Sequence, residues 1–313
     1  MINIAKKLYN SLYIINKGST IILTKQTFLE QFRTFYKDHN PKNFEEAIEK
    51  FAVFGGVGWG ELDTSKTTNE LVEKLILPDF TYIRNDVTEL TSGMPLYHSI
   101  LSAVAMGNGQ LSTTFKRANI SESVGMNAVQ ELCDIGVVKL QKGNKFFTSW
   151  KENESVADRL FFTSPFLRFW FAFVSPIFKG IRDGDYKEFH ERFSNREKEA
   201  LQLPFVELSH ELVKLSFKED PIESISTYWD NDIELDIFAK TKSGKIVVGV
   251  CKYTNSKVKK SELTKLQESC KVSNINADIF VVVSKNGYSS ELKKLKGEGV
   301  KLFTLKSFKA LVE

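Results

Sequence analysis

Three ionisable residues in the last third of the chain have types and spacing that suit phosphate-ester chemistry. They are Glu207 in an apolar helical pattern, Asp236 in the strand-like run 233–239, and Lys252 near the end of the apolar run 245–253. Carboxylate oxygens are the ligands that Mg²⁺ prefers, and a neighbouring Lys stabilises charge on a phosphate. We therefore take Asp236 and Glu207 as candidate metal ligands, and all three residues as candidate catalytic groups.

The residue two positions before Lys252 determines whether such a site is complete. Side chains alternate between faces along a strand, so positions 250 and 252 share one face. An acid at position 250 would complete an oxygen cage with Asp236, but the residue there is Val250. Glu234 shares the strand face of Asp236 but lies one pleat away, so we do not expect it to replace this acid. We expect a degenerate site, with Mg²⁺ as the cofactor only if the site is active.

An ordinary structural role is the alternative for the same residues. Asp236 and Lys252 would then form an ion pair at the end of a sheet, and Glu207 would be a solvated helix residue. The two hypotheses differ in the partners that they predict for these charged groups.

The elements that must position these residues alternate between helix and strand. Apolar periodicity and turn residues predict helices over 204–217, 261–271 and 289–296, and strands over 224–229, 233–239, 245–253, 279–284 and 300–305. This order predicts a mixed sheet flanked by helices.

Residues 95–148 have the pattern of three helices followed by two short strands. Helices are predicted over 95–106, 111–119 and 121–135, and Gly143-Asn144 marks a hairpin turn within 137–148. Three helices and a hairpin are typical of a winged helix-turn-helix. On DNA, the third helix would enter the major groove, and Lys142 and Lys145 of the wing would contact phosphates.

The exposed face of the third predicted helix favours a protein partner instead. Its polar positions carry no Lys or Arg and are Ser121, Glu122, Ser123, Asn127 and Gln130. A helix that enters a groove usually brings positive charge to the phosphates. A winged helix that docks a protein therefore stays open as an alternative.

Positive charge is concentrated near the end of the chain. Residues 240–313 contain 16 Lys and no Arg against 6 acidic residues, whereas the whole chain has a net charge of +4. A basic surface on one domain suits nucleic acid, and a solvated lysine surface is the alternative. We predict DNA as a partner, with Lys257, Lys259 and Lys260 among the contacts.

Cysteine, histidine and hydropathy patterns exclude several other classes. The three Cys residues and the four His residues lack the spacing of a zinc site or a disulfide framework, which favours a reducing compartment, the cytoplasm. The aromatic run 161–178 contains Arg168 and two prolines and is short for a bilayer crossing. We expect no membrane span and a buried aromatic element.

The glycine-rich stretch 55–66 is the one candidate for a phosphate-binding loop. Such a loop needs Lys directly after its last Gly, because that Lys reaches the phosphates of the nucleotide. Glu61 holds this place and would repel phosphate. We therefore predict a glycine-rich turn and no ATP binding.

Four short segments, in this order, resemble a known family. They are Phe51-Ala-Val-Phe-Gly-Gly56, Tyr97-His-Ser-Ile-Leu-Ser-Ala-Val-Ala105, Pro165-Phe-Leu-Arg-Phe-Trp-Phe171, and Ile233-Glu-Leu-Asp-Ile-Phe-Ala239 with Val250-Cys-Lys-Tyr253. On these segments the chain resembles the non-ATPase part of archaeal-type AAA ATPases that carry a C-terminal PD-(D/E)XK nuclease-like domain. In that family the first segment follows the ATPase core, the second opens a winged helix, and the last two belong to the nuclease-like domain.

The resemblance implies a fold class and a division into domains. The fold is an α+β multi-domain chain, with a helical N-terminal region over 1–90, a winged helix-turn-helix over 91–155, and a restriction-endonuclease-like α/β domain with a mixed central sheet over 156–313. No ATPase core is expected, since 50 residues precede Phe51. The family's usual Glu-Cys-Lys-Trp is Val-Cys-Lys-Tyr here.

These observations together predict a nucleic-acid-binding protein with a degenerate, inactive nuclease-like domain. The first alternative is an active Mg²⁺-dependent DNA endonuclease with Glu207, Asp236 and Lys252 as catalytic groups. The second is a non-catalytic adaptor whose winged helix binds a protein.

Overall fold

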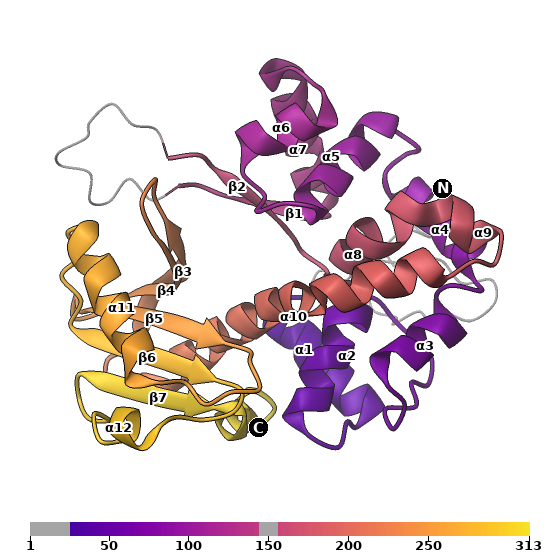
Figure 1. Ribbon diagram of the computed structural model, residues 1–313. Coiled ribbons are helices and arrows are strands. Elements are labelled where there is room, and N and C mark those ends of the chain that lie inside the picture. Colours follow the sequence, from indigo (N-terminus) through magenta and orange to yellow (C-terminus); the bar gives the residue numbers. More distant parts are fainter. Residues whose placement is uncertain (1–25, 144–155) are drawn as a thin grey trace, which may run out of the picture.

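The computed structural model describes residues 26–143 and 156–313 of the chain. Three groups of elements surround one long helix (Figure 1). Short helices lie at one end, a helical unit with a two-stranded sheet lies above, and a five-stranded sheet with its own helices lies at the other end. The molecule is therefore α+β, with its first helices N-terminal and its larger, mixed sheet C-terminal.

Side-chain caps mark the start of three of the first four helices. These four are α1 (Phe28–His39), α2 (Phe44–Phe54), α3 (Thr68–Leu75) and α4 (Phe80–Leu90), with α4 the exception. The Asn43 side chain accepts a hydrogen bond from the Glu46 amide at 2.9 Å, and α2 ends at Gly55. The Asn43 cap and Gly55 thus mark the two ends of α2.

The helical unit above α10 follows the predicted helices but not the predicted hairpin. Its helices are α5 (Pro95–Ala105), α6 (Leu111–Ala118) and α7 (Glu122–Ile135), and its strands are β1 (Val138–Gln141) and β2 (Arg159–Phe162). The sequence predicts the second strand before residue 148, whereas β1 pairs antiparallel with β2. The strand that pairs with β1 is therefore farther along the chain than predicted. Residues 144–155, which lie between the two strands, are outside the described ranges.

The aromatic run forms four short helical turns inside the core, as predicted. They are α8 (Pro165–Phe169), the π-helix η1 (Trp170–Val174), the 3-10 helix η2 (Ser175–Ile177) and α9 (Phe178–Arg182). Phe166, Trp170 and Phe171 are almost fully buried. Within the described ranges, none of the helices is both long and apolar enough to cross a bilayer.

One helix of 30 residues, α10 (Lys187–Ser216), connects the helical part to the larger sheet. The sequence predicts a helix that begins at Pro204, and this prediction is wrong because the helix begins at Lys187 and continues through that proline. A proline removes one helical hydrogen bond, which burial of a continuous apolar face can offset. Leu201, Phe205 and Leu208 form part of that buried face.

The larger sheet is mixed, as the sequence predicts. Its order is β3 (Ile222–Trp229), β4 (Glu234–Thr241), β5 (Ile246–Lys252), β6 (Ile279–Ser284) and β7 (Val300–Thr304). β3 pairs antiparallel with β4, and β4 with β5, whereas β5 pairs parallel with β6, and β6 with β7. The connecting helices are α11 (Lys260–Val272) and α12 (Ser290–Lys293), and the 3-10 helix η3 (Leu305–Leu311) follows β7.

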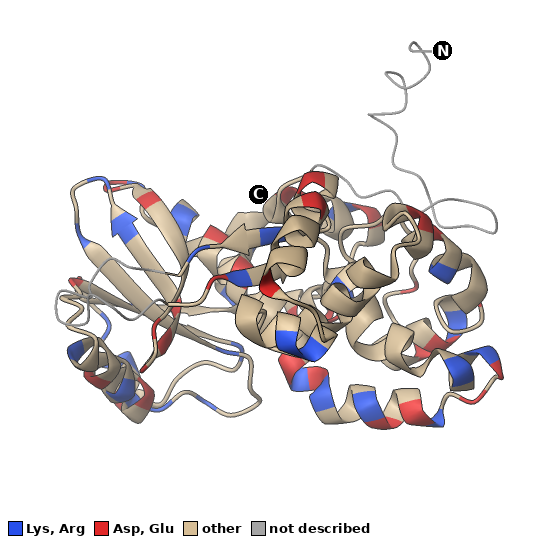
Figure 2. Cartoon of the chain, turned by 90° about the horizontal axis from the view of Figure 1, so that it is seen from above, with Lys and Arg blue, Asp and Glu red and all other residues tan. Residues whose placement is uncertain are grey.

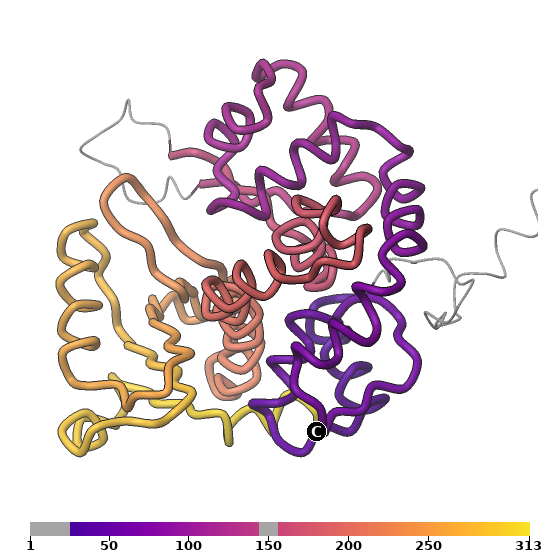
Figure 3. Tube along the Cα trace, turned by 45° about the vertical axis from the view of Figure 1, so that its right-hand side comes forward, coloured from indigo at the N-terminus to yellow at the C-terminus, as the bar shows by residue number. Residues whose placement is uncertain are grey.

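Helices cover the two faces of this sheet (Figure 1). Ile237 and Cys251 pack into the main core together with α10, whereas Val248 packs with Leu266 of α11 in a second cluster. The segment after β7 then returns to the first helices, as the chain trace shows (Figure 3). Phe308 stacks on Phe205 with ring centroids 5.4 Å apart.

Gly56 lies where α8 meets the end of α2, and it is predicted to tolerate no side chain. Its φ is +82°, and a Cβ would lie 2.6 Å from Gln31 Oε1 and 2.7 Å from Ser164 Oγ. Gly184 has a similar φ of +79° but no atom within 4 Å of such a Cβ. Gly184→Ala should lower the free energy of unfolding by about 1 kcal/mol through backbone strain alone, and Gly56→Ala by about 1–3 kcal/mol more through overpacking. Urea unfolding of both variants measures the difference, and equal losses would contradict the close approach.

Candidate functional site

Asp236 lies where two central strands separate. The last β4–β5 pair is Ile237 with Gly249, and Asp236 is the next residue outward. Its Oδ2 accepts a hydrogen bond from the Cys251 amide at 2.7 Å. The carboxylate thus replaces the backbone acceptor that the strand ladder no longer supplies, and it holds β4 to β5 at this end.

Two α10 side chains attach the long helix to the same place. His210 Nε2 donates to the Asp236 carbonyl oxygen at 2.6 Å, which requires the proton on Nε2 because a carbonyl only accepts. Gln202 Nε2 donates to the Cys251 carbonyl oxygen at 2.9 Å. The site predicted from the sequence included neither His210 nor Gln202. Both lie in an apolar helical pattern, which predicts a packed helix but no functional role for its polar residues.

Burial controls the protonation of Asp236. It raises the pKa of this carboxyl to about 6, against the lowering effects of the Cys251 amide and the Lys252 charge. Burial also lowers the pKa of His210. A buried carboxyl next to a cation is a group that can bind a metal or a proton, but here its nearest hydrogen-bond donor belongs to the protein.

Lys252 pairs with an acid from α11. Its Nζ lies 2.9 Å from Glu262 Oε2, and Glu262 also pairs with Lys265 at 3.0 Å. The hydrogen bonds from the two lysines lower the pKa of the Glu262 carboxyl. A carboxylate therefore reaches Lys252 from the first turn of the next helix instead of from position 250. The sequence prediction missed Glu262 because it searched for the acid on the strand.

Glu207 binds a different partner from the one expected for a metal ligand. Its Oε2 lies 3.0 Å from Lys139 Nζ of β1. Glu234, the acid one pleat from Asp236, pairs with Arg159 of β2 at 3.0 Å. The Arg159 side chain is only 7% exposed and lies 4.5 Å from the Trp229 ring centre. Basic residues of the β1–β2 pair therefore neutralise both acids.

Position 250 is apolar in its surroundings as well as in its side chain. Val250 packs at the edge of two hydrophobic clusters that contain Leu266 and Val282. Within residues 26–143 and 156–313, no three His, Cys, Asp or Glu side chains come together as a possible metal site. Asp236 and Lys252 meet at neighbouring strand ends, but the carboxylates around them have protein cations as partners.

Further hydrogen bonds join the β1–β2 pair to the edge of the larger sheet. Gln141 Nε2 donates to the Thr227 carbonyl oxygen, and Trp229 Nε1 donates to the Ala157 carbonyl oxygen, both at 2.8 Å. Together with the two ion pairs, these contacts place the small sheet beside the candidate site.

The predicted phosphate-binding lysines lie on two surfaces. Lys257 and Lys259 are exposed on the loop that follows Lys252, and Lys260 is exposed at the start of α11; none of the three forms an ion pair with a carboxylate of the described residues. Val258 anchors this loop, because its amide donates to the Gly287 carbonyl oxygen at 2.9 Å. Of the two remaining candidates, Lys142 is exposed directly after β1, and Lys145 lies outside the described residues. Basic positions occur on loops and strands of the larger sheet unit (Figure 2).

Comparison with known proteins gives a partial family match. A family described as archaeal and bacterial proteins of unknown function, DUF234, matches residues 170–265. This range contains Glu207, Asp236 and Lys252. No curated protein matches the chain significantly.

Among solved structures, the chain is similar to the crystal structure of protein VC1899 from Vibrio cholerae. The identity is 15% and the TM-score 0.28, and the alignment covers 70% of this chain and 55% of that one. The chain thus spans about half the length of that protein.

Asp236→Asn should change how stability depends on pH. The folded-state pKa of about 6 lies above the unfolded value, so the stability contribution of the neutral carboxyl is complete at low pH and is lost as pH rises through 6. Relative to the variant, the native protein should lose roughly 1–2 kcal/mol of unfolding free energy between about pH 4 and pH 7, after allowance for partial solvent screening.

Urea unfolding at several pH values measures this difference. Asp220→Asn is the control with the opposite sign, since hydrogen bonds from Ser243 lower the pKa of Asp220. If the difference in unfolding free energy between the native protein and Asp236→Asn does not change with pH, ionisation of Asp236 does not destabilise the fold.

Proposed function

We propose that this protein binds nucleic acid without sequence preference through a degenerate PD-(D/E)XK nuclease-like domain. The observation that carries the proposal is the position of Lys252 and three unpaired lysines, Lys257, Lys259 and Lys260, at one end of β5. Lysines that lack protein partners can neutralise phosphates and release counterions. The order α10, β3, β4, β5, α11, β6 and the strand positions of Asp236 and Lys252 support the nuclease-like assignment.

Internal partners explain why binding without cleavage is proposed. Metal-dependent hydrolysis needs several hard oxygen ligands that are free to hold Mg²⁺. Glu207 is paired with Lys139, and Asp236 accepts from the Cys251 amide. Val250 supplies no oxygen. The remaining group, Lys252, can still contact a phosphate if it exchanges its Glu262 partner for the ligand.

A protein-docking function for the α5–α7 unit is the second candidate. Its three helices and the β1–β2 pair support a winged helix-turn-helix, although the wing is longer than predicted. The exposed α7 surface combines the apolar Val124 and Met126 with the acidic Glu122, Glu131 and Asp134, and bears no Lys or Arg. Such a surface repels phosphates and favours a basic, partly apolar protein surface.

Duplex DNA binding should depend on the loop after β5. The native protein should bind with an affinity in the micromolar range that falls steeply with salt. Replacing Lys257, Lys259 and Lys260 together by Gln should weaken binding by at least about tenfold and reduce the slope of log K against log salt by about 2–3. Fluorescence anisotropy with labelled duplexes of unrelated sequence measures both quantities.

The matched control removes the same charge elsewhere in the same unit. Lys293, Lys294 and Lys296 are exposed around α12, and their triple replacement by Gln should change affinity less. If the two triple variants weaken DNA binding equally, affinity depends on the net charge of the unit and not on the position of these three lysines. Absence of binding at low salt by folded protein would sink the nucleic-acid proposal and leave the protein-docking function.

Val250→Glu tests whether the strand positions retain a metal site. In chelator the variant should be less stable than the native protein by about 1–3 kcal/mol, because a carboxylate would enter an apolar cluster. Mg²⁺ or Mn²⁺ should restore part of this loss if Asp236 and position 250 share a site.

Thermal melting with chelator and with metal is the measurement. Val250→Gln is the control, because Gln has nearly the size of Glu but no charge, and the stability of this variant should not change with metal. If Val250→Glu gains no stability from metal beyond this control, positions 236 and 250 do not face one site. The native protein should not cleave DNA in Mg²⁺, and cleavage would favour the active endonuclease.

A further inference from the structure

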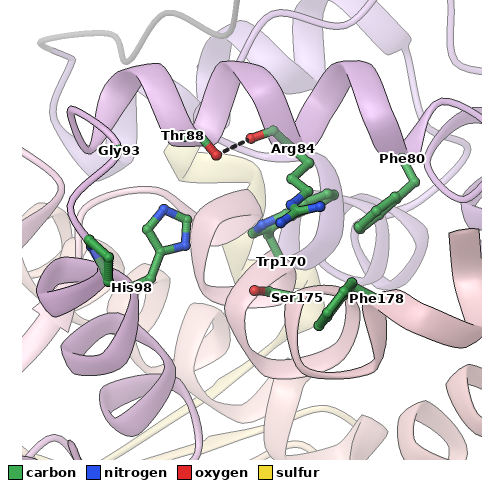
Figure 4. A pocket seen from close by; sticks show the side chains of 9 residues that line it. Phe80, Arg84, Thr88, Gly93, His98, Trp170, Ser175 and Phe178 are labelled. Atoms are coloured by element: carbon green, nitrogen blue, oxygen red, sulfur yellow. Dashed lines mark hydrogen bonds between the residues drawn. The ribbon is translucent and has the colours of Figure 1, made fainter.

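A separate pocket lies in the helical part, on elements that the proposed nucleic-acid function does not use. It has a volume of about 300 Å³ and lies between α4, the start of α5 and the η1–η2–α9 segment. Figure 4 shows its side chains arranged around a common space, with Arg84 reaching into it from α4. The volume is at the lower end of the range for small-molecule sites.

Aromatic rings form a preformed wall of this pocket. Phe80 stacks on Trp170 with ring centroids 5.5 Å apart and planes inclined by 15°. Both rings are almost fully buried, so their positions are determined by the core. The Phe178 ring lies on the same side as Phe80 in Figure 4. Phe178 is only partly buried, so it is the ring that offers apolar surface to a ligand, whereas Phe80 and Trp170 form the fixed base behind it.

Arg84 supplies an uncompensated positive charge. Its guanidinium carbon lies 5.2 Å from the centre of the Phe178 ring, and it pairs with no carboxylate in the part of the chain that the structure describes. Among the described residues, no acid lines the pocket. A cation that lies over a ring, without an anionic partner, is available to bind a carboxylate through two parallel hydrogen bonds.

A hydroxyl group and an unusual helical segment border the same space. Gly93 and Pro95 line it at the start of α5, whose N-cap residue Met94 provides no side-chain cap. Ser175 lines it immediately after the π-helix η1. π-helical turns are rare and occur often at functional sites. The Gly93 amide already donates to the Thr88 carbonyl oxygen at 2.8 Å and Pro95 has no N–H, so the Ser175 hydroxyl is the neutral group that can donate to an anion here.

His98 determines how much negative charge the pocket can accept. Its Nε2 lies 2.8 Å from Thr91 Oγ1, and that hydroxyl donates to the Val87 carbonyl oxygen, so Nε2 carries the proton and donates. Burial, followed by the nearby Arg84 charge, lowers the pKa of this ring. One full positive charge therefore faces the ligand near neutral pH, which matches a monoanion better than a dianion.

We propose that this pocket binds a small planar aromatic carboxylate, of about the size of benzoate. Arg84 pairs with the carboxylate, the Ser175 hydroxyl donates to it, and the Phe178 ring contacts the apolar part. The single cation selects a carboxylate over a phosphate dianion, and the aromatic wall selects a planar organic acid over an inorganic ion.

The test is isothermal titration of the full chain with three probes. Benzoate carries the planar ring and one charge, benzamide keeps the ring without the charge, and inorganic phosphate has charge without the ring. Benzoate should bind at least tenfold more tightly than either of the others. Equal binding of benzamide, tighter binding of phosphate, or no binding of benzoate at millimolar concentration would overturn the proposal.

Variants locate the binding in this pocket. Arg84→Gln should weaken benzoate binding at least tenfold, and Arg84→Lys less, because Lys keeps the charge but loses the planar pair of donors. Arg182→Gln on α9 is the matched control, since Arg182 is exposed and pairs with Asp183 outside the pocket. Thermal melting confirms folding of each variant. Native-like benzoate binding by folded Arg84→Gln, or an equal loss in Arg182→Gln, would refute the assignment.

Discussion

The buried carboxylate of Asp236 is the constraint on which the C-terminal architecture depends. It occupies the point where β4 and β5 separate, and its bond to the Cys251 amide replaces a missing ladder contact. A carboxylate there is expensive to bury, so its neighbourhood must supply donors and a cation. His210 and Gln202 of α10 bind the adjacent backbone carbonyls, and these contacts position the long helix across the sheet. One polar group thus determines how three elements meet.

A second consequence concerns the small sheet. Glu234, whose charge raises the pKa of Asp236, would repel that carboxylate if it were left unpaired, since like charges at short distance disfavour ionisation. Lys139 and Arg159 of the β1–β2 pair balance Glu207 and Glu234. Arg159 is itself buried and needs its acidic partner. The helical unit and the larger sheet are therefore coupled electrostatically, and a change in one alters the charge balance of the other.

The sequence predicted local features well and long-range pairing poorly. The ends of α2 follow from Asn43 and Gly55, because caps act over a few residues. Pro204 was a misleading marker, since burial of the α10 face outweighs one lost hydrogen bond. Asp236 and Lys252 occupy neighbouring strands as expected, but their partners were not predictable. Lys139 and Glu207 are 68 residues apart, and no local pattern records such a pair.

The contact between η3 and the first helices affects how the chain acquires its structure. Arg33 Nε donates to the Leu311 carbonyl oxygen at 2.6 Å, across 278 positions of sequence. During synthesis α1 leaves the ribosome long before Leu311 is made. Part of the surface of the N-terminal helices therefore stays exposed until η3 can pack on it. Contacts of such separation slow folding and prolong the exposure of apolar surface. The helical part therefore completes its packing only after residue 311 has left the ribosome.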